Sequence, residues 1–95
     1  MAETTSRAEV ATDKPAAYMR QLCKHFGHKV DAWFGEDSGY IQFDFGRCEL
    51  RAADRALSLQ VSAADQESHE RMEHVIGSHL ERFGRRDELS VAWQE

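Results

Sequence analysis

Four segments in the middle of the chain alternate between apolar and polar residues with a period of two. They are "KVDAWF" at 29–34, "YIQFDF" at 40–45, "RCELRA" at 47–52 and "ALSLQVSA" at 56–63. This is the period of a β-strand with one buried face, so we predict four strands. The residues expected to face the core are Val30, Ala32, Phe34, Ile41, Phe43, Phe45, Cys48, Leu50, Ala52, Leu57, Leu59, Val61 and Ala63.

The links between these segments are short enough for hairpins. "GEDS" joins the first pair and places Trp33 opposite Tyr40, and "ADRA" closes the third pair. Gly46 and Arg47 fit a two-residue type II′ turn, which places Phe45 opposite Cys48. One alternation then satisfies all three registers, which predicts a four-stranded antiparallel meander. The alternative is one long strand with a bulge at Gly46 and Arg47.

Two longer segments follow helical spacing instead. Residues 13–27, "DKPAAYMRQLCKHFG", and 65–84, "DQESHERMEHVIGSHLERFG", place apolar residues three and four apart, as an amphipathic helix does. Asp65 is a suitable N-cap for the second helix. The predicted apolar stripes are Tyr18, Met19, Leu22, Cys23 and Phe26 in the first helix, and Met72, Val75, Ile76, His79, Leu80 and Phe83 in the second.

Shorter alternating segments lie near both ends of the chain, "RAEVAT" at 7–12 and "ELSVAW" at 88–93. Six strands with one apolar face need a cover, which the two helices can supply. The predicted fold is α+β, a two-layer sandwich of an antiparallel sheet with two helices on one face, in the order β-α-β-β-β-β-α-β. Residues 1–6 are expected to be a disordered N-terminus and 7–95 a single domain. The pattern leaves open where the first and last strands lie in the sheet.

Composition and charge narrow the classes of function. The chain has 95 residues, a net charge of −5 and a pI near 5.5, which argues against a nucleic-acid binder because phosphates require a basic face. It has no apolar run near the roughly 20 residues that span a bilayer, and its start has no apolar segment typical of a secretory signal. With only two cysteines, we expect a cytoplasmic protein without a disulfide. Nothing in the sequence requires a cofactor.

The stretch "QLCKHFGHKV" concentrates candidate metal ligands. Cys23 and His25 are about 200° apart on a helix, and His28 follows the predicted helix end, so these residues do not form a local chelate. A metal site would have to combine His25, His28, His79 and one of Cys23 and Cys48, and such ligands favour zinc or iron.

Each of these residues also has an ordinary structural interpretation. His79 lies in an apolar stripe, so it is either a hydrogen-bonded core histidine or a ligand with a depressed pKa. Cys23 and Cys48 point inward as small buried hydrophobes do, whereas a nucleophilic thiol would need exposure and an adjacent base. His69 and His74 are expected to be solvated.

The sheet face away from the helices carries the candidate binding residues. Trp33 and Tyr40 pair there on an otherwise polar surface, and Arg51 lies on the same face. With His25, they are the residues we expect to contact a protein partner, a second copy of the chain, or a flat aromatic ligand such as a flavin or a catecholate. The alternative is a cross-strand pair that only stabilises its hairpin.

Three blocks of the sequence, "YMRQLCKHFGHK", "GYIQFDFGRCEL" and "GSHLERFGRRDELSVAW", resemble the bacterial family known as domain of unknown function 2218. The resemblance runs over roughly residues 8–94. The family has no established activity, but some members are fused to, or are neighbours of, siderophore-interacting flavin reductases. The resemblance therefore implies a role in iron acquisition with such a reductase as partner. The residues that carry it are Cys23, Lys24, His25, Phe26, His28, Gly46, Cys48, His79, Leu80, Arg82 and Phe83.

Taken together, these observations predict a small cytoplasmic binding or accessory domain in iron or siderophore handling, which acts through protein contacts. The second interpretation is a metal- or haem-binding protein that uses histidine and cysteine ligands. The third is a cysteine-dependent enzyme. Neither a phosphate-binding glycine loop nor a nucleophile elbow occurs in the sequence.

Overall fold

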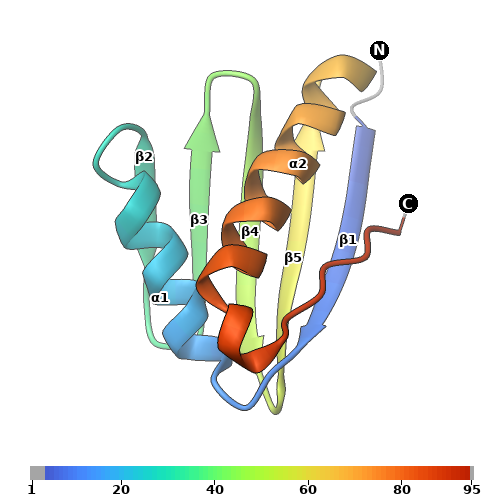
Figure 1. The fold of residues 1–95 in the computed structure, drawn as a ribbon. Coiled ribbons are helices and arrows are strands. Elements are labelled where there is room, and N and C mark those ends of the chain that lie inside the picture. The colour runs from blue at the N-terminus through green and yellow to red at the C-terminus, as the bar shows by residue number, and fades with distance from the viewer. Residues whose placement is uncertain (1–3, 95) are drawn as a thin grey trace.

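The computed structural model describes residues 4–94 and confirms a two-layer α+β fold. Five strands form one antiparallel sheet in the order β1-β5-β4-β3-β2, and two helices pack on one face of it (Figure 1). No helix among these residues is long and apolar enough to cross a membrane. The elements are β1 (Thr4–Ala11), α1 (Pro15–Phe26), β2 (Asp31–Phe34), β3 (Ser38–Phe43), β4 (Gly46–Ala53), β5 (Ala56–Ala63), α2 (Gln66–Phe83) and the 3-10 turn η1 (Arg85–Asp87).

The core between the layers is the one that the apolar stripes predict. Leu22 and Leu80 from the two helices are fully buried over Ile41, Leu57 and Leu59 of the sheet. The N-cap of α2 is also as predicted, because the Asp65 carboxylate accepts a hydrogen bond of 2.8 Å from the backbone N–H of Ser68. Periodicity alone therefore identifies the main elements and the faces that they bury.

The first strand begins earlier than expected. Thr4 pairs with Ala63, so residues 4–6, which we expected in a disordered terminus, belong to β1, and residues 1–3 lie outside the described residues. Ser6 is 1% exposed and donates a hydrogen bond of 2.6 Å to the Glu73 carboxylate of α2. This contact attaches the beginning of β1 to the helix layer. A polar residue buried in this way does not register in a hydrophobic pattern.

A polar cluster explains a second difference, at His69. This histidine, expected in solvent, is 1% exposed, with Nδ1 at 2.7 Å from the Thr4 hydroxyl and Nε2 at 3.0 Å from the Glu73 carboxylate. Thr4, Ser6, His69 and Glu73 thus join β1 to the first turns of α2. Each polar group has a partner, which makes the burial tolerable.

The turn between β3 and β4 lies two residues earlier than predicted. Phe43 pairs with Gly46 and Ile41 with Cys48, so Asp44 and Phe45 form the turn, and the alternative of one long bulged strand is wrong. The register moves by an even number of residues, which leaves the side chains of β3 and β4 on their predicted faces, whereas Phe45, predicted to face the core from a strand, lies in the turn. Gly46 is not in the positive-φ region that a type II′ turn requires of it.

The last predicted strand is wrong. After η1 the chain runs along α2 toward β1 (Figure 1) and meets the sheet at one bridge, where the backbones of Arg7 and Gln94 exchange two hydrogen bonds of 2.7 Å. Val91 and Trp93 pack on α2 where Gly77 has no side chain. Apolar and polar residues do alternate in this segment, but its apolar residues pack on helix α2 and not on a second layer beneath a sheet.

Candidate functional site

The open face of the sheet carries an ordered array of side chains. The strand registers align Trp33, Tyr40, Glu49, Gln60 and Arg7 in one row across all five strands. The two flanking rows contain Asp31, Gln42, Arg47, Ser62 and Thr5 on one side, and Ser38, Arg51, Ser58 and Glu9 on the other. A shallow hollow of about 530 Å³ is lined by the central row, by the row of Arg51 and by Arg47 of the remaining row.

Trp33 departs from the polar character of this face. It is 53% exposed, more than any other large hydrophobic residue between 4 and 94, and it stacks on Tyr40 with ring centroids 6.3 Å apart and an interplanar angle of 27°. Its ring also lies over Gly35, where an added Cβ would be 2.9 Å from Trp33 Cη2. The predicted cross-strand pair is therefore confirmed, and its outer ring is held in place while it is exposed to solvent.

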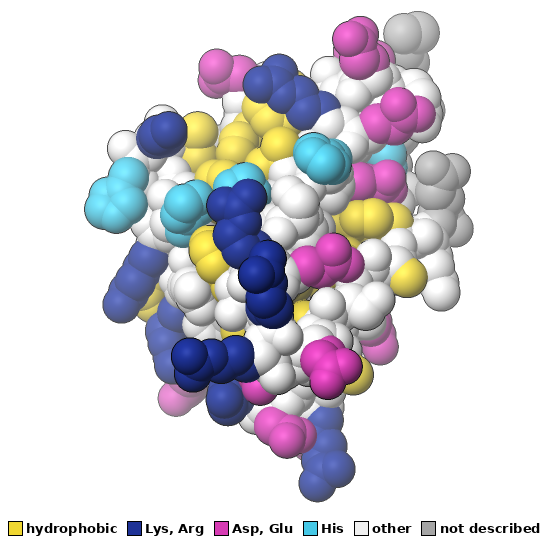
Figure 2. Space-filling view, in the orientation of Figure 1, with side chains coloured by type: hydrophobic (Ala, Val, Ile, Leu, Met, Phe, Trp, Pro, Cys, Tyr) yellow, Lys and Arg dark blue, Asp and Glu magenta, His cyan; other side chains and the backbone are white. Residues whose placement is uncertain are grey.

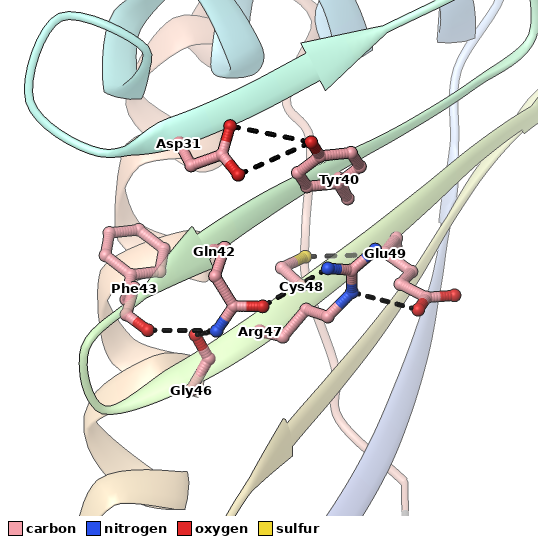
Figure 3. A network of polar contacts seen from close by, with 8 residues as sticks. All are labelled: Asp31, Tyr40, Gln42, Phe43, Gly46, Arg47, Cys48 and Glu49. Atoms are coloured by element: carbon pink, nitrogen blue, oxygen red, sulfur yellow. Dashed lines mark hydrogen bonds and ion pairs between the residues drawn. The ribbon is translucent and has the colours of Figure 1, made fainter.

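Arg47 is tied into a network beside the aromatic pair (Figure 3). Its guanidinium lies 4.3 Å from the centroid of Tyr40 and donates to Gln42 Oε1 at 3.2 Å and to Glu49 Oε2 at 3.1 Å. Arginine in this position keeps its charge while it stacks on the ring. Tyr40 is therefore contacted from two sides, by Trp33 and by Arg47.

Arg51 lies in the next row and is exposed. Its cross-strand neighbours are Ser38 and Ser58, and it forms no ion pair within residues 4–94. Its guanidinium is thus free to meet a carboxylate or another oxyanion from outside the chain. His25, the fourth candidate binding residue, belongs to α1 and so lies on the helix-covered side, away from this row.

The two cysteines are free and buried between the layers, Cys23 on α1 and Cys48 on β4. Cys23 Sγ is 3.6 Å from the Trp33 carbonyl oxygen and 4.0 Å from that of Tyr40, and burial raises its pKa to about 11. Cys48 is fully buried, and burial raises the pKa of its thiol as well. Neither thiol faces solvent as a reactive thiol does.

The histidines predicted as ligands are brought together only in part. The rings of His25 and His79 are 5.1 Å apart by centroid, whereas the buried cysteines do not join them. Residues 4–94 contain no group of three or more histidine, cysteine or acidic side chains arranged to hold a metal ion. Partial desolvation lowers the pKa of His25, and the neighbouring His79, His28, Lys29 and Arg82 lower it further. Lys29 and Arg82 lie near this histidine although neither is adjacent to it along the chain, and no local spacing predicts that arrangement.

Comparison with known proteins places the chain in a bacterial family. No curated protein matches it. A solved structure described as the NMR structure of PA4090 from Pseudomonas aeruginosa is 33% identical to it, with a TM-score of 0.80, over 95% of this chain and 94% of the other. The family described as "Uncharacterized protein conserved in bacteria (DUF2218)" matches residues 7–94. The chain therefore belongs to the DUF2218 family, as its three sequence blocks predicted.

Proposed function

We propose that this protein is a binding domain that docks a partner protein on the open face of its sheet. The observation that carries the proposal is Trp33, which is 53% exposed and yet held by Tyr40 and Gly35 on the sheet face opposite the two helices. Exposed tryptophan is costly in water, and a rigid exposed aromatic ring is typical of an interface anchor.

The residue types of the face support a protein as the occupant. Tryptophan, tyrosine and arginine are the residues that most often dominate binding energy at interfaces, and Trp33, Tyr40, Arg47 and Arg51 lie together here. Glu49 and Asp31 provide charges of the opposite sign, so the face is not a simple anion-binding surface. A matching partner would offer an apolar recess for Trp33 and a carboxylate for Arg51.

The dimensions agree with this interpretation. Five strands about 4.8 Å apart, of four to eight residues that rise about 3.4 Å each, form a face of roughly 550 Å². That is about two thirds of the roughly 800 Å² that each partner buries in a standard interface. Small-molecule sites, by contrast, enclose most of their ligand, which a shallow sheet face does not do.

We extend the proposal to a role in iron or siderophore handling, with a siderophore-interacting flavin reductase as the partner. The support for this step is the resemblance described above, because some relatives are fused to such reductases or are their neighbours. The open face supplies the surface on which a reductase would dock. A different partner on the same face would refute the reductase assignment but would leave the docking surface as proposed.

The test is a calorimetric titration of the protein with a siderophore-interacting flavin reductase from the same bacterium. We expect Trp33→Ala to weaken binding by about 2 kcal/mol, roughly thirtyfold, and Arg51→Ala to weaken it less. Arg20→Ala is the matched control, because Arg20 is exposed on α1 on the other side of the molecule, and it should bind as the wild type does.

Sedimentation velocity of the protein alone separates the outcomes. Equal binding by the wild type and by a folded Trp33→Ala variant would show that the open face is not the docking surface. If the reductase does not bind but the protein self-associates in a way that Trp33→Ala abolishes, the occupant is a second copy, and the reductase assignment is wrong. If neither occurs, both parts of the proposal fail.

A further inference from the structure

The helix-covered side carries a second surface that the proposed docking face does not use. His25, His28 and Lys29, from the last turn of α1 and the segment after it, meet His79 and Arg82 of α2. We call these five residues the basic cluster. Figure 2 shows histidine side chains gathered on this side of the molecule, next to lysine and arginine side chains.

The two central imidazoles rest on aromatic rings. The His25 centroid lies 4.9 Å from that of Phe26 and 5.4 Å from that of Phe83, and the His79 centroid lies 4.9 Å from that of Phe26. Phe26 in turn packs on Phe43 of the sheet, with centroids 5.1 Å apart. This apolar floor positions the histidines and limits the water that can solvate their inner edges.

His79 has a defined tautomer in this arrangement. Its Nδ1 is 2.7 Å from the Val75 carbonyl oxygen, and a carbonyl can only accept a hydrogen bond. Nδ1 must therefore carry a proton, which leaves Nε2 as the atom that gains or loses one. The ring is fixed by its own helix and presents one titratable nitrogen.

The cluster lacks a counter-charge. The charged groups that act on His25 are His28 and Lys29 from the segment after α1 and His79 and Arg82 from α2, and all of them are basic. Lys29 and Arg82 form no ion pair within the described part of the chain, and the neighbouring Glu81 carboxylate accepts a hydrogen bond of 2.9 Å from the backbone N–H of Val91. Two permanent positive charges and up to three more on the imidazoles thus face solvent together.

We propose that the basic cluster binds an oxyanion, the phosphate or carboxylate group of a ligand. Arginine offers paired N–H donors to such a group, and lysine offers a mobile point charge. A metal cation fits these surroundings less well, because Lys29 and Arg82 repel it and no carboxylate joins the histidines. The negative charge of the ligand would neutralise the positive charge of the basic cluster.

The proposal predicts the direction in which ligand binding changes with pH, because binding is linked to protonation of the imidazoles. An oxyanion favours protonated imidazoles, so its binding raises the pKa values of His25 and His79 and weakens as pH rises through those values. A metal ion requires unprotonated imidazoles, so it would lower the apparent pKa values and bind more tightly as pH rises. The two ligand classes therefore act in opposite directions on the same two rings.

The test is an NMR titration of the five histidines from pH 5 to 8, in chloride, with inorganic phosphate and with acetate. At saturation we expect phosphate to raise the pKa values of His25 and His79 by roughly half a unit to one unit, since a charge about 5 Å away acts through a mostly aqueous medium. His69 and His74 serve as internal references that should not move. A response to both anions identifies the shared oxyanion chemistry, and a response to one identifies the preferred group.

Two variants make the result specific. Arg82→Gln should weaken phosphate binding roughly tenfold or more, whereas Arg71→Gln, which changes an arginine on the same helix that stacks on Phe45, should not. Equal losses in both variants would reduce the effect to general charge attraction and overturn the site. Tight binding of Zn²⁺ that lowers the two pKa values, without a response to phosphate or acetate, would replace the anion site with a metal site.

Discussion

Gly46→Ala is a direct test of the corrected β3–β4 register. An added Cβ would lie 2.5 Å from Met72 Cγ and 2.8 Å from the Ser62 carbonyl oxygen, well inside the 3.5–4.0 Å of an ordinary carbon contact. Met72 is fully buried and Ser62 belongs to the neighbouring strand β5, so neither can retreat freely. Overpacking of this kind lowers the free energy of unfolding by about 1–3 kcal/mol. Alanine also reduces the conformational entropy of the unfolded chain, which raises the free energy of unfolding by about 0.4–1 kcal/mol. We expect a net loss of about 1–2 kcal/mol.

Gly46→Ala alone does not show whether the loss comes from steric contact with Met72 or from a backbone conformation that requires glycine. The assay is therefore a double-mutant cycle with Met72→Ala, in which the free energy of unfolding is measured in urea. If Met72 causes the loss, removal of its side chain should relieve it, and Gly46→Ala should cost about 1 kcal/mol less in the Met72→Ala background. Contact with the Ser62 carbonyl would account for what remains. Additivity within about 0.5 kcal/mol would refute the role of Met72 and leave the Ser62 carbonyl contact or the backbone conformation of Gly46 as the cause.

Three further outcomes follow from the core and from the shifted pKa values. Leu80→Ala should cost about 2–5 kcal/mol in a denaturant titration, because Leu80 is fully buried between the layers, and a loss below about 1 kcal/mol would contradict this packing. A hydrogen bond from the Tyr18 hydroxyl lowers the pKa of Asp87 below its usual 3.8, so the stability lost in Tyr18→Phe should be constant above about pH 5 and should shrink as pH falls below that value. Cys23, whose pKa is raised to about 11, should react with thiol reagents at pH 7 only after unfolding, and rapid labelling of the native protein would show that the thiol is accessible.

The strands and helices were predictable because their periods are unambiguous. Apolar residues at every second position identified β3, β4 and β5, and the three-four spacing identified α1 and α2. The pairing of Trp33 with Tyr40 followed from the short link between them, which admits few registers. These features are local, and local patterns are what a single sequence displays most clearly.

The errors arose where two physical causes select the same residue type. Glycine at position 46 fits a type II′ turn, but it also fits a strand position pressed against Met72, and the structure has the second. Alternation at the C-terminal end fits a strand, but it also fits an extended segment that lays Val91 and Trp93 against Gly77 of α2. Only the tertiary structure distinguishes the members of each pair.

The candidate sites divide in the same way. The open face could be predicted, since its residues alternate with core residues along each strand. The basic cluster could not, because His25 and His79 lie in separate helices, and their distance depends on how those helices pack. Helical phase placed His25 about 200° from Cys23 on its own helix, and that angle carries no information about the second helix.

The protein buries both of its thiols and exposes aromatic and cationic side chains, which is relevant to the third interpretation, a cysteine-dependent enzyme. Burial raises the pKa of Cys23 to about 11, so a far smaller fraction of this thiol is ionised at pH 7 than of an ordinary thiol. Cys48 is fully buried, with its pKa raised in the same direction. Both features argue against a cysteine nucleophile, whose rate follows its thiolate fraction and its access to substrate. The groups that solvent can reach are instead an aromatic ring at Trp33, a guanidinium at Arg51 and an imidazole at His25, which recognise surfaces and charges. These exposed groups are the ones that the proposed docking face and the proposed anion site use.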